Sequence, residues 1–330
     1  MTVGRAHDVV VKVHAAGLCG SDLYLFRGHE PTDGSEIVMG HEFVGEIVAA
    51  GDDVRSLKVG DRVVSPFTVS CGNCFYCANM HSSRCFQSQL FGSERLDGAQ
   101  AEYIRVPLAE TTLFKAPLDL SDNALLLMSD IFPTGFYGVQ NAFASLRPQE
   151  CAASVAVVIG CGPVSMCAIV ATLEYNVKHL FAIDIVESRL KIAENLGAIP
   201  LNLQDGETSM LNAIAAITQG RGADVVVEVV GQEPALRLAY DIVRPFGCIS
   251  SIGAHFSSMP SSAAEGYNKN VTLRMGRCPV RLIFARALDA LLKRQHVFKF
   301  MFEHKMSLID ASKAYELFDK NQVQKIIFET

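Results

Sequence analysis

Four cysteines stand within fifteen residues of this 330-residue chain, and no other feature limits its local fold so strongly. Their spacing is Cys71-x₂-Cys74-x₂-Cys77-x₇-Cys85. Structural zinc takes four tetrahedral ligands, and short spacings let one loop wrap the ion. The rival interpretation is a redox Cys-x-x-Cys pair, which needs two cysteines rather than four. The spacing therefore predicts a structural zinc site.

The chain is too long for one ordinary hydrophobic core, so we expect two domains. Its 49% hydrophobic and 19% charged residues are typical of a globular protein. The net charge of −6 argues against nucleic acid or anionic membrane as a partner. Apolar runs stay below the roughly 20 residues that span a bilayer, and residues 1–8 lack a signal-peptide pattern. We expect a cytoplasmic protein.

Three stretches of the chain differ in their pattern of apolar residues and glycines. Residues 1–125 contain short apolar runs that glycines interrupt, which predicts a compact β-rich barrel. Residues 126–270 alternate apolar strands with amphipathic helices, which predicts a doubly wound parallel sheet. Residues 271–330 are mixed. The expected fold class is α/β, with these elements: strands at 43–48, 62–64, 154–159, 180–184, 224–229 and 247–252, and helices at 188–196, 283–293 and 308–318.

A glycine loop follows the first strand of the second stretch. It reads Gly160-Cys161-Gly162-Pro163-Val164-Ser165, and Asp184 ends the next strand 22 residues after Gly162. Such glycines let the backbone approach a pyrophosphate at a helix N-terminus, and the acid can bind ribose hydroxyls while repelling a 2′-phosphate. The pattern favours NAD over NADP; the alternative is a tight strand-to-helix turn. The residues assigned to the cofactor are Gly160, Gly162, Pro163, Val164, Asp184, Arg189 and Gly253.

Two further motifs lie near the N-terminus. Cys19-Gly20-Ser21-Asp22 offers a thiolate beside a hydroxyl and a carboxylate, and Gly40-His41-Glu42 offers an imidazole beside an acid. In isolation, a single cysteine or histidine in a barrel is more often a packing residue than a ligand.

Together these motifs resemble the zinc-dependent alcohol dehydrogenases of the medium-chain dehydrogenase/reductase superfamily. The two N-terminal motifs, the cysteine loop, Gly60-Asp-Arg-Val63 and the Gly160 loop have that family's order and spacing, from about residue 9 to the C-terminus. The resemblance implies a GroES-like catalytic domain interrupted by a Rossmann domain. Relatives have one or two strands before the segment matching Val9–His14, so we expect an exposed barrel edge if those strands are missing.

The resemblance also implies a catalytic zinc held by Cys19 and His41. The third ligand would lie in the stretch 129–135, where many relatives carry cysteine or glutamate. This chain has Asp130, as do relatives similar to glutathione-independent formaldehyde dehydrogenases, and sorbitol dehydrogenase-like enzymes are also similar. We expect two Zn²⁺ ions per chain.

Roles for neighbouring residues come from the same resemblance. Ser21 would accept the substrate proton, Asp22 would orient His41, and Glu42 would sit behind the metal. Thr134 would contact the nicotinamide. The alternative for Ser21 is a turn-capping serine. Relatives often continue the proton relay at a histidine where this chain has Tyr24.

The expected function is hydride transfer between an alcohol (or an aldehyde or ketone) and NAD. The expected partner is a small-molecule substrate, with Phe91 and Phe132 in its pocket, and the expected assembly is a homodimer or homotetramer. His255 is interpreted as a loop histidine, and Arg277 as a phosphate contact or a surface arginine. The alternatives are a zinc- and NAD-binding isomerase or lyase, and a non-catalytic dinucleotide-binding protein.

Overall fold

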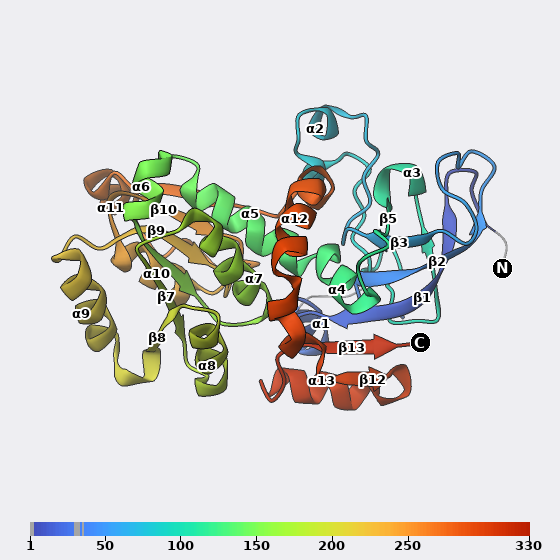
Figure 1. The fold of residues 1–330 in the computed structure, drawn as a ribbon. Coiled ribbons are helices and arrows are strands. Elements are labelled where there is room, and N and C mark those ends of the chain that lie inside the picture. The colour runs from blue at the N-terminus through green and yellow to red at the C-terminus, as the bar shows by residue number, and fades with distance from the viewer. Residues whose placement is uncertain (1–2, 30–33, 35) are drawn as a thin grey trace. The chain divides into compact units, whose positions relative to one another are not determined.

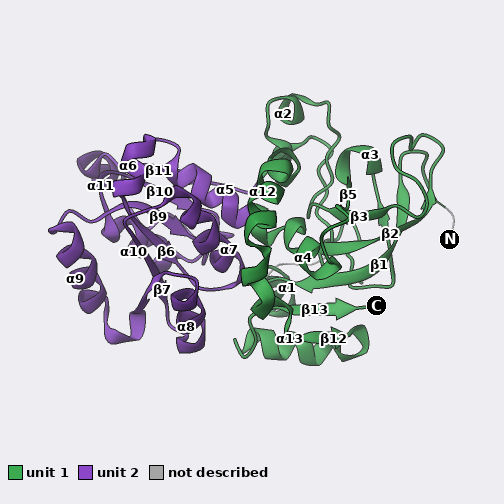
Figure 2. Ribbon diagram, viewed as in Figure 1, with its two compact units in different colours: residues 1–133, 279–330 green, residues 134–278 purple. Residues whose placement is uncertain are grey.

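The computed structural model describes residues 3–29, 34 and 36–330, and it consists of two compact units (Figures 1 and 2). The described residues up to 133, together with 279–330, form unit 1, and residues 134–278 form unit 2. The sequence pattern predicts domain boundaries at 125/126 and 270/271. Residues 126–133 belong to unit 1 because they pack there: the Ser129 hydroxyl donates to the carbonyl of Phe43 and accepts from its N–H. Residues 271–278 belong to unit 2 because they supply its edge strand.

Unit 1 is built on one mostly antiparallel sheet. The order of its strands is β12-β13-β1-β2-β3-β5, and β4 also pairs with β1. Valines of β1 alternate toward a hydrophobic core, where Val9, Val11 and Val13 are fully buried. The strands are β1 (Val9–Leu18), β2 (Glu42–Ala50), β3 (Arg62–Ser65), β4 (Tyr103–Val106), β5 (Phe114–Lys115), β12 (Lys305–Ser307) and β13 (Ile326–Glu329).

Short helices connect these strands, and one long helix follows the return from unit 2. The helices are α1 (Asp22–Phe26), α2 (Phe75–Ala78), α3 (Ala109–Thr112), α4 (Asp122–Leu126), α12 (Val280–Arg294) and α13 (Ala311–Asp319). Helix α5 (Ile131–Phe143) carries the first boundary between the units. The helix expected at 308–318 is a 3₁₀ turn at Leu308–Asp310 followed by α13.

Unit 2 is a six-stranded sheet in which every pairing is parallel. Its order is β11-β10-β9-β6-β7-β8. The chain forms β6 in the middle of the sheet, adds β7 and β8 toward one edge, and then adds β9, β10 and β11 toward the other. This is the order of a doubly wound dinucleotide-binding sheet, and its switch point lies between β6 and β9. The strands are β6 (Val155–Ile159), β7 (His179–Asp184), β8 (Ile199–Asn202), β9 (Ala223–Glu228), β10 (Val243–Ser251) and β11 (Thr272–Met275).

The expected strands of unit 2 are present within one residue, except that β10 begins four residues before the expected Gly247. Its pairing with β9 is interrupted between Val243 and Cys248. The alternation of side chains typical of a strand is broken there, so the sequence pattern does not reveal the first residues of β10. The helices are α6 (Pro148–Ala153), α7 (Pro163–Thr172), α8 (Glu187–Asn195), α9 (Glu207–Thr218), α10 (Glu233–Ile242) and α11 (Ala263–Lys269). Gly197, at a φ of +100°, follows α8 and ends it as expected.

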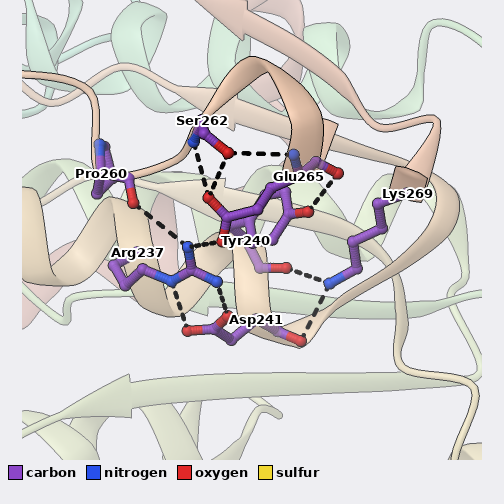
Figure 3. Close-up of polar contacts among 7 residues, drawn as sticks. All are labelled: Arg237, Tyr240, Asp241, Pro260, Ser262, Glu265 and Lys269. Atoms are coloured by element: carbon purple, nitrogen blue, oxygen red, sulfur yellow. Dashed lines mark hydrogen bonds and ion pairs between the residues drawn. The ribbon is translucent and has the colours of Figure 1, made fainter. Parts of the chain in front are cut away.

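A polar network joins α10 to α11 (Figure 3). The guanidinium of Arg237 donates to Asp241 at 2.9 Å and to Glu265 at 2.8 Å. Glu265 also forms a capping box with Ser262, and Tyr240 donates its hydroxyl to the Glu265 carbonyl at 2.6 Å. The ammonium of Lys269 lies 4.5 Å from the centre of the Tyr240 ring. Helix α11 is short, and these contacts fix it to α10. No helix of the described residues is both long and apolar enough to cross a bilayer.

Candidate metal and cofactor sites

Three elements of unit 1 bring Cys19, His41 and Asp130 together. Cys19 follows β1 and His41 precedes β2, and these strands are antiparallel neighbours in which Gly17 pairs with Glu42. Asp130 follows the 3₁₀ turn at 127–129 and precedes α5. One ligand atom from each of Cys19, His41, Glu42 and Asp130 lies within 4.8 Å of the others. A thiolate, an imidazole and a carboxylate so close together suit a zinc ion.

Asp22 fixes both of the N-terminal ligands. Its Oδ2 accepts the backbone N–H of Cys19 at 2.9 Å, and its Oδ1 lies 3.0 Å from Nδ1 of His41. A carboxylate only accepts, so Nδ1 carries the hydrogen and Nε2 keeps its lone pair for a metal. That Nε2 lies 3.4 Å from Oδ2 of Asp130.

Charge in this cluster favours a cation. Burial by itself would lower the pKa of His41, but the charges of Asp22 and Cys19 outweigh it and raise the pKa well above its usual range. Burial, followed by the charge of Glu42, raises the pKa of the Cys19 thiol. Both shifts include a contribution from neighbouring negative charge. A divalent cation would offset that charge.

Behind the cluster, Glu42 forms a buried ion pair with Lys325. The ammonium lies 2.5 Å from Oε2 of Glu42 and donates to the Leu18 carbonyl at 3.0 Å. The other carboxylate oxygen, Oε1, is buried and has no hydrogen-bond partner among the described residues. An unpartnered buried oxygen beside three candidate ligands fits a cation at this position.

Ser21 lies on the exposed side of the same site. Its hydroxyl is 3.5 Å from Nε2 of His41. Although Ser21 precedes α1, its side chain makes no capping hydrogen bond within the described chain. The turn-capping alternative therefore has no support in the geometry. Tyr24, on α1, is half-buried and lies edge-on to His29 with ring centres 6.3 Å apart.

The four cysteines of the first motif also converge. Their sulfur atoms lie within 4.8 Å of one another, and Gly72, at a φ of +75°, turns the chain between the first two. Backbone N–H groups point at these sulfurs: Cys71 and Gln87 donate to Cys85 at 3.2 and 3.3 Å. Hydrogen bonds from the backbone of Cys77 and Phe86 lower the pKa of Cys74 to about 6. N–H donors stabilise thiolates, and four thiolates in one loop are the ligand set of a structural zinc site.

The glycine loop of unit 2 follows β6 at the switch point of the sheet. Gly160 has a φ of +94°, which favours glycine. Gly162 has an ordinary φ of −72°, and no heavy atom of the described chain lies within 4 Å of the position a Cβ would take. Packing within the described chain does not require that glycine, which is also the N-cap of α7. A ligand close to the backbone would require it, and α7 begins there with Pro163 and Val164.

Asp184 ends β7 beside this loop, as expected. Its carboxylate accepts the N–H of Cys161 at 2.6 Å, and those of Ile185 and Val186 at 2.7 and 2.8 Å. Arg189, on α8, is half-buried, and its Nε is buried without a partner among the described residues. Burial lowers the pKa of Arg189, and Asp184 partly opposes that shift. The arginine therefore has a donor left for a ligand near Asp184.

Known proteins with the same domains are numerous. Residues 5–117 match the alcohol dehydrogenase GroES-like domain and residues 163–293 match the zinc-binding dehydrogenase domain. Zinc-type alcohol dehydrogenase B of Aspergillus flavus is 50% identical over 322 residues, which cover 98% of this chain and 75% of that protein. The chain belongs to the zinc-dependent alcohol dehydrogenases.

Other proteins and solved structures are also similar to this chain. The medium chain reductase/dehydrogenase ucsI of Acremonium sp. is 64% identical over 260 residues, covering 79% of this chain and 89% of that protein. The structure of alcohol dehydrogenase TADH from Thermus sp. ATN1 has a TM-score of 0.90 and 34% identity, covering 100% of this chain and 94% of that one. A short chain alcohol dehydrogenase (rspB) from E. coli CFT073, complexed with cofactor NADH, has a TM-score of 0.82 and 27% identity, covering 100% and 94%.

Membership of the zinc-dependent alcohol dehydrogenases confirms the expected fold class, a GroES-like domain with a Rossmann domain, and a zinc-dependent oxidoreductase function. The two alternatives, an isomerase or lyase and a non-catalytic binding protein, are not favoured. Both phenylalanines expected in the substrate pocket are buried: Phe91 packs edge-on against Phe43, and Phe132 against Phe298. Phe91 belongs to the hydrophobic core of unit 1, so its role is packing.

Sequence reasoning missed several buried polar contacts of this dehydrogenase. Lys325 follows no recognisable motif and lies 283 residues from its partner Glu42. His255, interpreted as a loop residue, bonds to Glu228 and Ser251, which the sequence did not single out. Glu228 is an acidic residue at the end of a buried strand, and this feature of the sequence could have indicated the contacts with His255 and Ser251. Thr134 is half-buried in the first turn of α5, and Arg277 is exposed.

Proposed function

We propose that this protein is an NAD-dependent alcohol dehydrogenase that transfers a hydride between an alcohol, or the corresponding aldehyde or ketone, and NAD. The observation that carries the proposal is the convergence of Cys19, His41 and Asp130 within 4.8 Å, with Asp22 setting the histidine tautomer. Three ligands of this kind leave a fourth zinc position for substrate. The E. coli relative complexed with NADH and the glycine at position 162, which packing does not require, support NAD as the cofactor.

We propose two zinc sites per chain. Cys19, His41 and Asp130 would hold the catalytic ion, and Cys71, Cys74, Cys77 and Cys85 would hold the structural one. When bound, the catalytic zinc supplies Lewis acidity that makes a substrate hydroxyl acidic, and NAD supplies the hydride acceptor.

The chain's own residues perform the remaining tasks. Asp22 holds the His41 ring in place by accepting a hydrogen bond from Nδ1, which leaves Nε2 directed at the metal position. The Ser21 hydroxyl, on the exposed side of the site, receives the proton that a substrate hydroxyl loses and passes it to water. Glu42 and Lys325 supply an ion pair behind the ligands. Thr134 is assigned to the nicotinamide on the strength of the family resemblance.

The cofactor residues fall into two groups. Gly160, Gly162, Pro163 and Val164 form the turn and helix start that would cradle the pyrophosphate. Asp184 would accept the ribose hydroxyls, with Arg189 beside it, and Gly253 follows β10 on the other side of the switch point.

We also infer a cytoplasmic homodimer or homotetramer. All ten cysteines are free, which is typical of a reducing compartment. Family members associate through the edges of their Rossmann sheets, and the edge strands here are β11 and β8. Light scattering after size-exclusion chromatography tests the assembly.

The test of function is NADH formation by the zinc-replete protein on a panel of primary, secondary and polyol substrates. Cys19→Ala, which removes one ligand, is the control. We expect turnover with NAD, weaker turnover with NADP, and none in the variant. Absence of turnover on every substrate, in protein that binds zinc and NAD, would contradict the proposal.

A further inference from the structure

Three polar side chains meet at the carboxyl ends of β9 and β10, outside the residues assigned so far. Glu228 ends β9 and Ser251 ends β10, and the two are register partners. The Ser251 hydroxyl donates to Oε2 of Glu228 at 2.7 Å, and Nε2 of His255 lies 2.9 Å from the same oxygen and 2.8 Å from the hydroxyl. Glu228 is fully buried, and only 11% of the His255 side chain is exposed. Burying a carboxylate so deeply is costly unless it is hydrogen-bonded, and Glu228 is held by several such bonds.

Glu228 also holds the two loops that follow these strands. Its Oε1 accepts the backbone N–H groups of Val230 and Gly231, both at 2.7 Å. A Cβ at Gly253 would stand 2.2 Å from the nitrogen of Gly231, so the two loops touch backbone to backbone. The carboxylate and this close approach fix the loop after β10 against the loop after β9.

These loops lie beside the candidate cofactor site, on the side away from β7. The glycine loop follows β6, and a Cβ at Gly160 would stand 2.9 Å from Cγ2 of Val230. Asp184, the candidate for the adenosine ribose, ends β7 on the opposite side of β6. With the pyrophosphate at the glycine loop and the adenosine toward β7, the other half of the dinucleotide must run over the ends of β9 and β10.

The hydrogen bonds of His255 also set its tautomer. Because the Glu228 carboxylate only accepts, Nε2 of His255 must carry the hydrogen. In the neutral ring Nδ1 is then an acceptor, and it makes no hydrogen bond within the described residues.

We propose that Glu228, Ser251 and His255 form a positioning network for the nicotinamide half of the dinucleotide. Glu228 fixes the two loops and the tautomer of His255, and Nδ1 of His255 accepts a hydrogen bond from a ribose hydroxyl or amide N–H of the cofactor. The network rests on the NAD dependence proposed above.

The test compares His255→Gln with wild type in calorimetric titrations with NADH and with AMP. Glutamine keeps an Nε2 donor toward Glu228 and removes the acceptor at the δ position, so the fold should be retained. We expect the Kd for NADH to rise about five- to tenfold, the range of one lost hydrogen bond. The Kd for AMP, which lacks the nicotinamide half, should stay within about twofold, because no contact with AMP is changed. His179→Gln is the matched control, because His179 lies at the amino end of β7, away from the carboxyl ends that hold the proposed site, and should leave both affinities unchanged.

Ser251→Ala removes one hydrogen-bond partner of the His255 ring. It should raise the Kd for NADH less than His255→Gln does, by about two- to threefold. Unchanged NADH affinity in His255→Gln would overturn the proposal, and so would equal losses for NADH and AMP, which would indicate a general effect on the domain. Failure of wild-type protein to bind NADH would instead contradict the proposed NAD dependence itself.

Discussion

Lys325 Nζ lies 2.5 Å from Oε2 of Glu42, and the two side chains are 1% and 0% exposed. They come from opposite ends of the chain, Glu42 at the start of β2 and Lys325 immediately before β13. Burial alone would lower the pKa of Lys325, but the charge of Glu42 outweighs it and raises the pKa, so the ammonium stays charged at neutral pH. The pair therefore balances one of the negative charges gathered around the candidate catalytic zinc.

Replacing Lys325 by methionine should destabilise the protein by about 3–5 kcal/mol, because it leaves the Glu42 carboxylate buried without its counter-charge. Urea unfolding of the zinc-replete protein measures this. The double variant Lys325→Met/Glu42→Gln should recover much of the loss. Lys320→Met, which removes an exposed lysine 3.8 Å from Glu316, is the control and should stay within about 0.5 kcal/mol. A Lys325→Met protein as stable as wild type would show that the pair contributes nothing.

Asp22→Asn should weaken zinc binding at the catalytic site by about 10- to 100-fold, the usual effect of losing an outer partner of a ligand. Asparagine has one acceptor oxygen, so it cannot hold both the Cys19 N–H and Nδ1 of His41. Competition with a chromophoric chelator gives the affinity. Asp319→Asn, at the exposed pair with Arg27, should leave it unchanged. Equal zinc affinity in Asp22→Asn and wild type would refute the orienting role.

The two proposed zinc sites should be separable by mutation. Cys77→Ser should lower the zinc content from about two to about one per chain and lower the melting temperature, since a structural zinc contributes directly to folding. Cys19→Ser should also remove about one zinc and abolish turnover. Elemental analysis combined with thermal unfolding distinguishes them. Cys151→Ser, at a buried cysteine outside both clusters, should retain both ions; a loss of zinc there would undermine the assignment.

Substitution by alanine should have different effects on stability and NADH affinity at two glycines near the candidate cofactor site. Gly162→Ala should leave stability unchanged within about 0.5 kcal/mol but weaken NADH binding about tenfold or more, because its Cβ meets only the space assigned to the pyrophosphate. Gly253→Ala should destabilise unit 2, because its Cβ would stand 2.2 Å from the nitrogen of Gly231. Unfolding curves and NADH titrations of both variants test this. If Gly162→Ala bound NADH normally, the glycine loop would not be the pyrophosphate site.

Helix α11 should lose part of its anchoring in acid. Backbone N–H donation from Ser262, followed by the side chain of Arg237, lowers the pKa of Glu265 to about 2. A depressed acid contributes stability above its unfolded pKa of about 4.3, and that contribution disappears as the pH falls toward 2. The urea midpoints of wild type and Glu265→Gln should therefore differ at pH 6 and approach each other at pH 3.5. A constant difference would mean that the charge of Glu265 is not what holds α11.

Local patterns were sufficient for much of this protein. The spacing of the four cysteines lies within one loop, so chain connectivity alone brings the sulfurs together. The strand, glycine loop and helix from Val155 to Thr172 form a contiguous unit, and its signals are propensity and turn chemistry. Cys19, His41 and Asp130 needed the family resemblance, because nothing local says that residues 19 and 130 meet.

The α/β class, the cysteine cluster and the cofactor loop can be predicted from the amino-acid sequence, because each depends on residues close together in the chain. The contacts between distant groups are visible only in the folded protein: Lys325 with Glu42, His255 with Glu228, and Phe91 with the core rather than a pocket. Those contacts depend on strand order and register, which bring together residues separated by 27 positions in one case and by 283 in another. The free energy of a buried charge depends on that neighbour and not on the residue's own motif.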